Sequence, residues 1–169
     1  MKLATIHAQP YDIEATGFYF ESFEEYEKKA AKNKNSYGQP VEEYEFQFID
    51  GSQWNDGQRA LDCLGLELFF EIDSTWREED IEKLEIMIEE LGSQSIPRDA
   101  WDIEKMMEDC IFYFGDKKDL ADELLETYYP DLYKALSESR AHWYFDALEF
   151  IQAHTDGSFG DGYYFESTR

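Results

Sequence analysis

The chain has 169 residues and a formal net charge of −24 at pH 7, from 39 acidic and 15 basic side chains. This charge excludes a nucleic-acid binder that works by neutralising phosphates, and it disfavours an anionic membrane as a partner. Hydrophobic residues make up 43% of the sequence and aromatic residues 17%, which predicts a folded protein rather than a disordered acidic chain. No apolar run approaches the roughly 20 residues of a membrane span, and the two cysteines lack CxxC spacing; both features predict a soluble cytoplasmic protein with reduced thiols.

The first 51 residues are predicted to form a three-stranded sheet with one helix. Strands are expected at residues 2–9, 17–20 and 41–50, the last with aromatic residues at alternate positions. Ser22 followed by Glu25 has the spacing of a capping box, which predicts a helix that continues to about Lys32.

Residues 52–109 are predicted to be helical. A short helix is expected over 58–64 and another over 99–108, while 67–73 is compatible with a strand or, more in keeping with its length and neighbours, a helix. A further helix is predicted over residues 76–92, between 67–73 and 99–108. Its sequence, WREEDIEKLEIMIEELG, has one apolar stripe at helical spacing and carboxylates elsewhere. Ser74 or Thr75 is expected to cap this helix and Gly92 to end it. The apolar stripe comprises Ile81, Leu84, Ile88 and Leu91, with Met87 beside it.

Residues 110–169 are predicted to form a second α/β unit. Strands are expected at 110–114 and 162–166, and helices at 117–128, near 132–136 and over 143–153. Asp116 is a candidate cap for the first of these helices, which is expected to bury Leu120, Leu124 and Tyr128. The chain as a whole is therefore predicted to have a mixed α+β fold of three small subdomains, with boundaries after residues 51 and 109.

Side chains that carry catalytic chemistry are not arranged in a recognisable motif. Carboxylate pairs arise by chance in so acidic a chain, and the three histidines, His7, His142 and His154, lack metal-ligand spacing. Cys63 and Cys110 have no evident base nearby. The stretch DGSFGDG at 156–162 fits a glycine turn better than a calcium loop, because alternating oxygen ligands and a closing glutamate are missing. The sequence therefore predicts no enzyme, no cofactor and no metal site.

The acidic pattern is the positive signal, since carboxylates occupy the exposed face of element after element. A surface that serves only solubility normally mixes both signs of charge. B-DNA carries one charge per roughly 1.7 Å of its axis, so 24 excess charges correspond to about 41 Å of duplex and those of a dimer to about 82 Å. We therefore predict a DNA mimic. Its binding surface is expected to comprise Glu43, Glu45, Glu67, Glu71, Glu78, Glu79, Glu82, Glu85, Glu89, Glu90, Asp119, Asp122, Glu123 and Glu126.

The sequence also resembles a known family. ATIHAQPYDIEATGFYFESFEEYEKKAA, continued by GQPVEEYEFQFIDG, is similar to the amino-terminal domain of the ArdA antirestriction proteins. That pattern has a short opening strand, a Gly-aromatic strand, an acidic-aromatic helix start and an E-E-[YF]-E strand ending in Asp. In the carboxyl half, DLADELLETYYPDLYKALSESRAHWYFDALEFI resembles the family's helix and proline loop. Where family members commonly carry an Arg-Asp pair, this chain has Phe150 and Ile151.

The resemblance implies an elongated, curved chain of three small domains, together with a function and partners. ArdA proteins come from phages and mobile elements and act as duplex mimics, competing with DNA for the specificity and methyltransferase subunits of type I restriction-modification enzymes. The family usually dimerises through its carboxy-terminal domain, which makes Leu132, Tyr133, Trp143 and Phe145 candidates for a homodimer interface. Three alternatives stay open: mimicry of DNA towards a CRISPR effector or another DNA-binding protein, an acidic scaffold without mimicry, and an enzyme that uses carboxylates.

Overall fold

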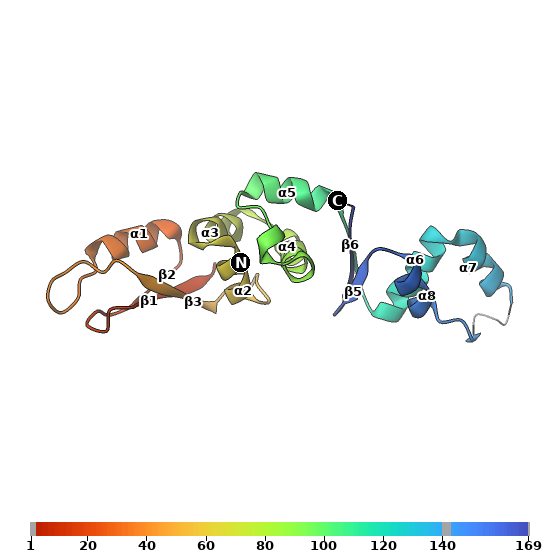
Figure 1. Cartoon of the computed structure of the whole chain (residues 1–169), viewed down its shortest axis with the longest axis horizontal. Helices are drawn as coiled ribbons and strands as arrows, with labels where there is room; N and C mark the ends of the chain where they lie inside the picture. The colour runs from red at the N-terminus through yellow and green to blue at the C-terminus, as the bar shows by residue number, and fades with distance from the viewer. Residues whose placement is uncertain (1–2, 140–142, 169) are drawn as a thin grey trace. The chain divides into compact units, whose positions relative to one another are not determined.

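The structure is a computed structural model that describes residues 3–139 and 143–168 (Figure 1). It has a mixed α+β fold, as the sequence predicted, with helices and two small antiparallel sheets. The chain divides into two compact units, Met1–Glu104 and Lys105–Arg169. The predicted boundary after residue 51 falls inside the first unit, and the predicted boundary after residue 109 lies close to the division. The three-subdomain organisation stays a prediction.

The first unit begins with a sheet of strands β1 (Thr5–Pro10), β2 (Phe18–Phe20) and β3 (Tyr44–Asp50), in the order β2-β1-β3. Strand β1 pairs with both other strands, and Ile6 and Ala8 on one of its faces are fully buried, as is Ala4 just before it. Ile6 lies in register with Phe20 on one side and Phe48 on the other, so the flanking strands supply the bulky side chains of the core.

Helix α1 (Phe23–Lys32) packs on this sheet through Tyr26, whose ring centroid lies 5.1 Å from that of Phe20 and 5.2 Å from that of Phe46 (Figure 1). Its predicted start is confirmed, since the Ser22 hydroxyl accepts a hydrogen bond from the Glu25 N–H at 3.1 Å. The Glu25 carboxylate reaches back to the N–H of Glu21, one residue further than a standard capping box.

The helices of the first unit share a core with the sheet. They are α2 (Gly57–Leu64), α3 (Leu66–Thr75), α4 (Glu78–Leu91), a 3-10 turn η1 (Ser93–Ser95) and α5 (Ala100–Glu108), which contains the division between the units. The ambiguous segment 67–73 is helical. Phe69 of α3 is fully buried and stacks on Trp54 at 4.7 Å, with Phe48 of β3 at 6.1 Å. Burial of these rings joins helices to strands.

The start of α4 differs from the prediction. Ser74 and Thr75 belong to α3, where their hydroxyls donate to the carbonyls of Phe70 and Glu71, and α4 begins after Arg77 without a side-chain cap. The predicted caps were wrong because α4 begins later than expected. Its N-cap position is Arg77, while Ser74 and Thr75 lie in the last turn of α3 with their hydroxyls directed to carbonyls of that helix. The predicted end is confirmed, because Gly92 follows α4 with φ of 85°.

A buried carboxylate connects three segments of the first unit. Asp73 of α3 is only 1% exposed, and its oxygens accept hydrogen bonds from the Ala4 N–H at 2.8 Å, the Trp54 indole at 2.8 Å and the Gln53 amide at 3.2 Å. All three donors are neutral groups. Asp73 thereby ties the start of the sheet and the loop before α2 to α3, a role that sequence analysis did not assign.

The second unit contains a sheet of strands β4 (Cys110–Phe114), β5 (Ser158–Gly160) and β6 (Tyr163–Ser167), in the order β4-β6-β5, with helices α6 (Lys117–Tyr128), α7 (Pro130–Ser137) and α8 (Ala147–His154). Leu120, Leu124, Ile151 and Tyr164 form its core. Tyr128, predicted to be buried, is 39% exposed at the end of α6. Within the described residues, no helix combines the length and the apolar character needed to cross a membrane.

Candidate functional site

Helix α4 exposes a narrow line of glutamates, which we call the α4 stripe. Glu78, Glu82, Glu85 and Glu89 follow at intervals of four, three and four residues, so they share one face over about 16 Å of helix axis. The remaining faces of α4 are largely enclosed: Ile81, Leu84, Ile86, Met87 and Ile88 are all buried. The predicted apolar stripe included Leu91, which is only half-buried, and left out Ile86, which is buried, because a single apolar side was assumed. A helix packed on several sides leaves only narrow exposed lines, here most of the α4 stripe and Glu79 beside it.

Glu85 differs from its neighbours because it is half-buried and bonded to backbone. Its carboxylate accepts hydrogen bonds from the N–H of Asn55 at 3.1 Å and of Asp56 at 2.8 Å, just before α2. Burial raises the pKa of the Glu85 carboxyl, the charges of Asp56 and Glu82 raise it further, and the two N–H groups oppose this by lowering it. Glu85 therefore holds α2 against α4, and its oxygens are largely engaged within the unit.

Two substitutions separate the acceptor role of Glu85 from its charge. Glu85→Gln keeps an acceptor for the N–H groups and removes repulsion, so its free energy of unfolding at neutral pH should equal or slightly exceed that of wild type. Glu85→Ala leaves those N–H groups without their acceptor and should lower it by about 1 kcal/mol. Denaturant unfolding of both variants measures this; equal destabilisation by Gln and Ala would contradict it.

The raised pKa of Glu85 also determines the direction in which the stability of the protein changes with pH. Between its unfolded and folded pKa values the folded state binds more protons, so wild-type stability falls as pH rises through that interval. The stability of Glu85→Gln relative to wild type should therefore increase with pH there and then level off.

Two other predicted acids of α4 have arginine partners. Glu89 pairs with Arg59 of α2, and Glu79 lies 3.5 Å from Arg77. The side chains of both pairs are between 43% and 76% exposed, and such surface pairs contribute little to stability. Glu90 is half-buried, whereas Glu78 and Glu82 are exposed. Glu78 and Glu82 are thus the members of the α4 stripe that present most of their charge to solvent.

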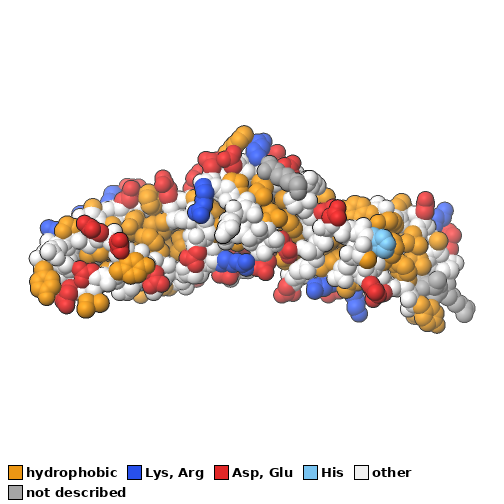
Figure 2. All heavy atoms as spheres, in the orientation of Figure 1, with side chains coloured by type: hydrophobic (Ala, Val, Ile, Leu, Met, Phe, Trp, Pro, Cys, Tyr) orange, Lys and Arg blue, Asp and Glu red, His pale blue; other side chains and the backbone are white. Residues whose placement is uncertain are grey.

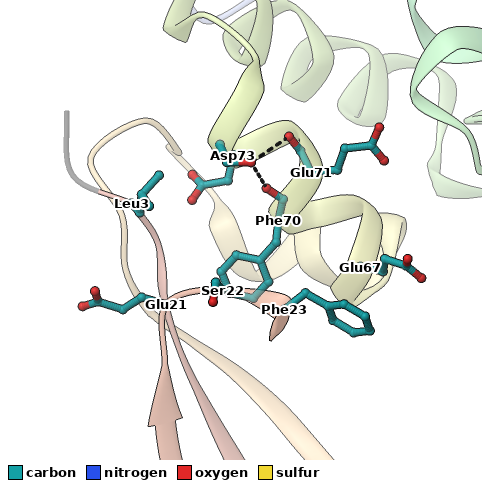
Figure 3. Close-up of a pocket in the computed structure, with 9 residues that line it drawn as sticks. Leu3, Glu21, Ser22, Phe23, Glu67, Phe70, Glu71 and Asp73 are labelled. Carbon is teal, nitrogen blue, oxygen red and sulfur yellow. Dashed lines mark hydrogen bonds between the residues drawn. The ribbon is translucent and has the colours of Figure 1, made fainter. Parts of the chain in front are cut away.

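Glu67 and Glu71 lie one turn apart on α3 and are exposed. Both line a cleft of about 250 Å³ whose apolar lining includes Phe23 and Phe70 (Figure 3). In that view the two glutamates project from α3 towards the same side, with Glu67 beside the ring of Phe23, while Glu21 lies across the cleft. The cleft therefore combines an apolar floor with acidic edges.

Glu43 and Glu45 are exposed at the start of β3. Glu45 lines a groove of about 580 Å³ together with Asp62 of α2, an exposed acid that sequence analysis did not single out. Gln58 connects the two elements, since its amide donates to the Phe46 carbonyl at 3.2 Å and to Asp62 at 3.0 Å. Asp62 and Glu45 line the same groove only because β3 and α2 are in contact, which the sequence does not show. The available sequence signal was that Asp62 follows Gln58 by four residues, which places both side chains on one face of α2.

The second unit has its own line of acids on α6, which we call the α6 stripe. It comprises Asp119, Asp122, Glu123 and Glu126, all exposed, at the intervals that place side chains on one helix face over about 10 Å. Leu120, Ala121, Leu124 and Leu125 are buried on the opposite side, as the hydrophobic periodicity indicates.

The negative charge cannot be neutralised within the chain. Even if each of the 15 basic residues paired with a different carboxylate, 24 of the 39 acids would be left without a basic partner. The excess is shared: the first unit has 25 acidic and 9 basic residues, the second 14 and 6. Figure 2 shows acidic side chains spread over both units, with basic side chains scattered between them. Of the fourteen predicted acids, all but Glu85 and Glu90 are exposed.

The four candidate interface residues have different surroundings. Leu132, Tyr133 and Phe145 are partly buried against the core of their own unit, which leaves less of their surface for a partner. Trp143 is 77% exposed and is followed by Tyr144, which is 92% exposed. Of the set, Trp143 is therefore the residue with most surface available, and dimerisation stays a prediction.

The histidines and cysteines are held in separate local contacts. His7 bonds to Gln47 at 3.2 Å, His154 bonds to the Phe150 carbonyl at 2.8 Å, and His142 lies outside the described residues. Cys63 is buried, and its thiol lies 3.8 Å from the carbonyl of Ser93. Within the part of the chain that the structure describes, no three His, Cys, Asp or Glu side chains come together as a metal site would require.

Comparison of the chain with protein-family models, with curated proteins and with solved structures finds no match.

Proposed function

We propose that this protein is a non-enzymatic DNA mimic that inhibits type I restriction-modification enzymes in the cytoplasm by occupying their DNA-binding groove. The single observation that carries the proposal is the uncompensated negative charge held on ordered elements. Acids without basic partners lie on helices and a strand whose opposite faces are packed in a core, rather than in a polar low-complexity tail. A protein that grips duplex through lysine and arginine would find on these elements anions held in fixed positions.

The geometry of the stripes supports this proposal. Each acid of the α4 and α6 stripes has another acid of its stripe three or four residues away, which corresponds to about 5–6 Å between those side chains. One strand of B-DNA presents a charge every 3.4 Å or so of its axis. The stripes therefore offer a basic groove short rows of negative charge at a lower density than a DNA strand, chiefly from Glu78, Glu82 and the α6 stripe, without any base to be read.

The resemblance to ArdA proteins supports the choice of target. Residues 4–51, which carry the most specific part of it, include the sheet and helix α1 of the first unit, with Glu45 exposed on β3 and Glu43 exposed just before it. The same resemblance supports the proposed homodimer and the specificity and methyltransferase subunits as partners. It also supports a role in evading host defence for a phage or mobile element.

Displacement of labelled duplex from a purified type I methyltransferase tests the proposal. The protein should displace the duplex, and its affinity should fall by more than about a hundredfold between roughly 50 and 200 mM salt. Displacement that does not respond to salt would contradict electrostatic mimicry. Absence of displacement, with the duplex still bound by the enzyme, would favour another target or an acidic scaffold.

A further inference from the structure

Two loops at one end of the N-terminal sheet form an ordered surface of which the proposed function uses only Glu43. One, residues 11–17, joins β1 to β2, and the other, residues 33–43, joins α1 to β3. Five hydrogen bonds between the described residues join the two loops. The side-chain amides of Asn35 and Asn33 donate to Asp12 Oδ2 (2.8 Å) and Thr16 O (3.0 Å). Ser36 donates from its N–H to Glu14 O (2.9 Å) and from its hydroxyl to Glu14 Oε2 (3.0 Å), and the Tyr11 N–H donates to Glu43 O (3.2 Å). The Asn35 side-chain oxygen also accepts the N–H groups of Tyr37 and Gln39, both at 3.0 Å, so the second loop is fixed internally.

These loops hold large apolar side chains out in solvent. Ile13 is 93% exposed, Tyr37 is 76% exposed and Tyr11 is 64% exposed. Ile13 lies between Asp12 and Glu14, the residues that bond to the second loop, and Tyr37 directly follows Ser36 at the other end of those bonds. Single exposed apolar residues are common, but three on adjacent, mutually bonded loops are typical of an interaction surface.

A groove beside these side chains is acidic. Its volume is about 530 Å³, and it is lined by Tyr11, Asp12, Gln39, Pro40, Val41, Glu42 and Glu43, a set with three carboxylates and no Lys or Arg among the described residues. The Asn35 amide and the Glu14 N–H lower the pKa of the Asp12 carboxyl, which keeps Asp12 ionised at neutral pH. Such a groove, with an aromatic ring in its wall, suits the aliphatic stem and cationic end of an Arg or Lys side chain.

We propose that Ile13 and Tyr37, with the groove lined by Tyr11, Asp12, Glu42 and Glu43, form a docking surface for a protein that presents an Arg or Lys side chain beside an apolar depression. We call it the tip surface. Charge decides the occupant: a second copy of this chain, a nucleic acid or an anionic membrane would each bring negative charge against these carboxylates. The inference rests on the proposed function, because it assigns to the target enzyme a contact that duplex DNA does not make.

The tip surface is tested by the same duplex displacement from a type I methyltransferase, carried out over a series of salt concentrations. The tip variant is Ile13→Ser with Tyr37→Ser, and a matched control, Ile49→Ala, truncates an isoleucine of β3 that is 50% exposed. Because apolar contacts are not screened by salt, the tip variant should lose about tenfold in affinity at every salt concentration, with the salt slope unchanged. The control should match wild type, and thermal unfolding should be the same for all three proteins.

Each outcome separates the two proposals. Wild-type displacement with an unaltered tip variant would overturn the tip surface and leave the proposed function standing. A tip variant whose salt slope falls would also overturn it, since the loops would then act only through charge. Failure of the wild-type protein to displace duplex would contradict the proposed function and remove the tip surface with it.

Discussion

Replacing Asp73 by alanine is expected to lower the free energy of unfolding by about 3–5 kcal/mol, a large part of the total stability of a domain of this size. The carboxylate is 1% exposed and accepts bonds from Ala4, Gln53 and Trp54. Without it, the Ala4 N–H and the Trp54 indole lose their acceptor in a place that water does not reach, and each unsatisfied donor costs about 1–3 kcal/mol. The Gln53 amide keeps its bond to the backbone carbonyl of residue 73 at 2.7 Å. Denaturant unfolding followed by tryptophan fluorescence measures the loss directly, because Trp54 is one of the partners.

Asp73→Asn provides an intermediate case. It keeps the shape and one acceptor oxygen but places an amide N–H₂ opposite donors, so it should lose less stability than alanine and still fall clearly below wild type. Asp62→Ala, an exposed acid of α2 in the same unit, is the matched control and should lie within about 0.5 kcal/mol of wild type. An alanine variant as stable as this control would show that the Asp73 bonds do not hold the sheet to α3.

Neutralising four stripe acids together is expected to weaken binding to the target enzyme with little change in stability. The variant combines Glu78→Gln, Glu82→Gln, Asp119→Asn and Glu123→Gln, all at exposed positions. At about 0.5 kcal/mol for each exposed charge, affinity at low salt should fall roughly 30-fold, and the salt dependence should become less steep. Removing the like-charge pairs 78/82 and 119/123 should add about 0.2–0.5 kcal/mol each to the free energy of unfolding, but Glu78 and Asp119 lie in the first turns of their helices, where loss of a negative charge costs about 0.3–1 kcal/mol each. Duplex displacement measures the loss of affinity, and thermal unfolding checks that the fold is kept.

A second quadruple variant distinguishes position from net charge. Glu27→Gln, Asp102→Asn, Glu138→Gln and Asp161→Asn remove the same charge from exposed positions outside both stripes. It should retain most of the wild-type affinity at moderate salt, where charges further apart than about 10 Å are screened from one another. An equal loss in both variants would show that the stripes are not the binding face.

The elements with strong local signals were predicted almost to the residue. Strand β4 (Cys110–Phe114) and helix α6 (Lys117–Tyr128) have the predicted bounds, and the Asp116 side chain caps α6 by accepting from the Lys118 N–H at 3.2 Å. Here a dense apolar run, a glycine and a capping acid follow one another, so every signal acts over a few residues. Short-range signals of this kind need no tertiary contact to be read.

Elements that depend on a partner elsewhere in the chain were missed or displaced. Strand β5 (Ser158–Gly160) lies in a segment predicted as a glycine turn, and it exists because it pairs with β6 in the register Phe159 to Tyr164. A segment of three residues has no intrinsic strand preference strong enough to be recognised in the sequence. The pairing with β6 is what makes this segment a strand. Tyr128 has helical spacing with Leu124 but comes at the last residue of α6, where the core has ended.

The sequence by itself determined the class of fold, the length of most helices and the large negative charge, because composition and periodicity are properties of the chain before it folds. Only the tertiary structure decided what individual acids do. Asp73 became a buried acceptor, Glu85 a support for α2, and Glu78 with Glu82 part of an exposed row, although all four are carboxylates on neighbouring helices. The physical reason is that the environment of a carboxylate is set by the donors and apolar groups brought to it from distant segments, and no local pattern records them.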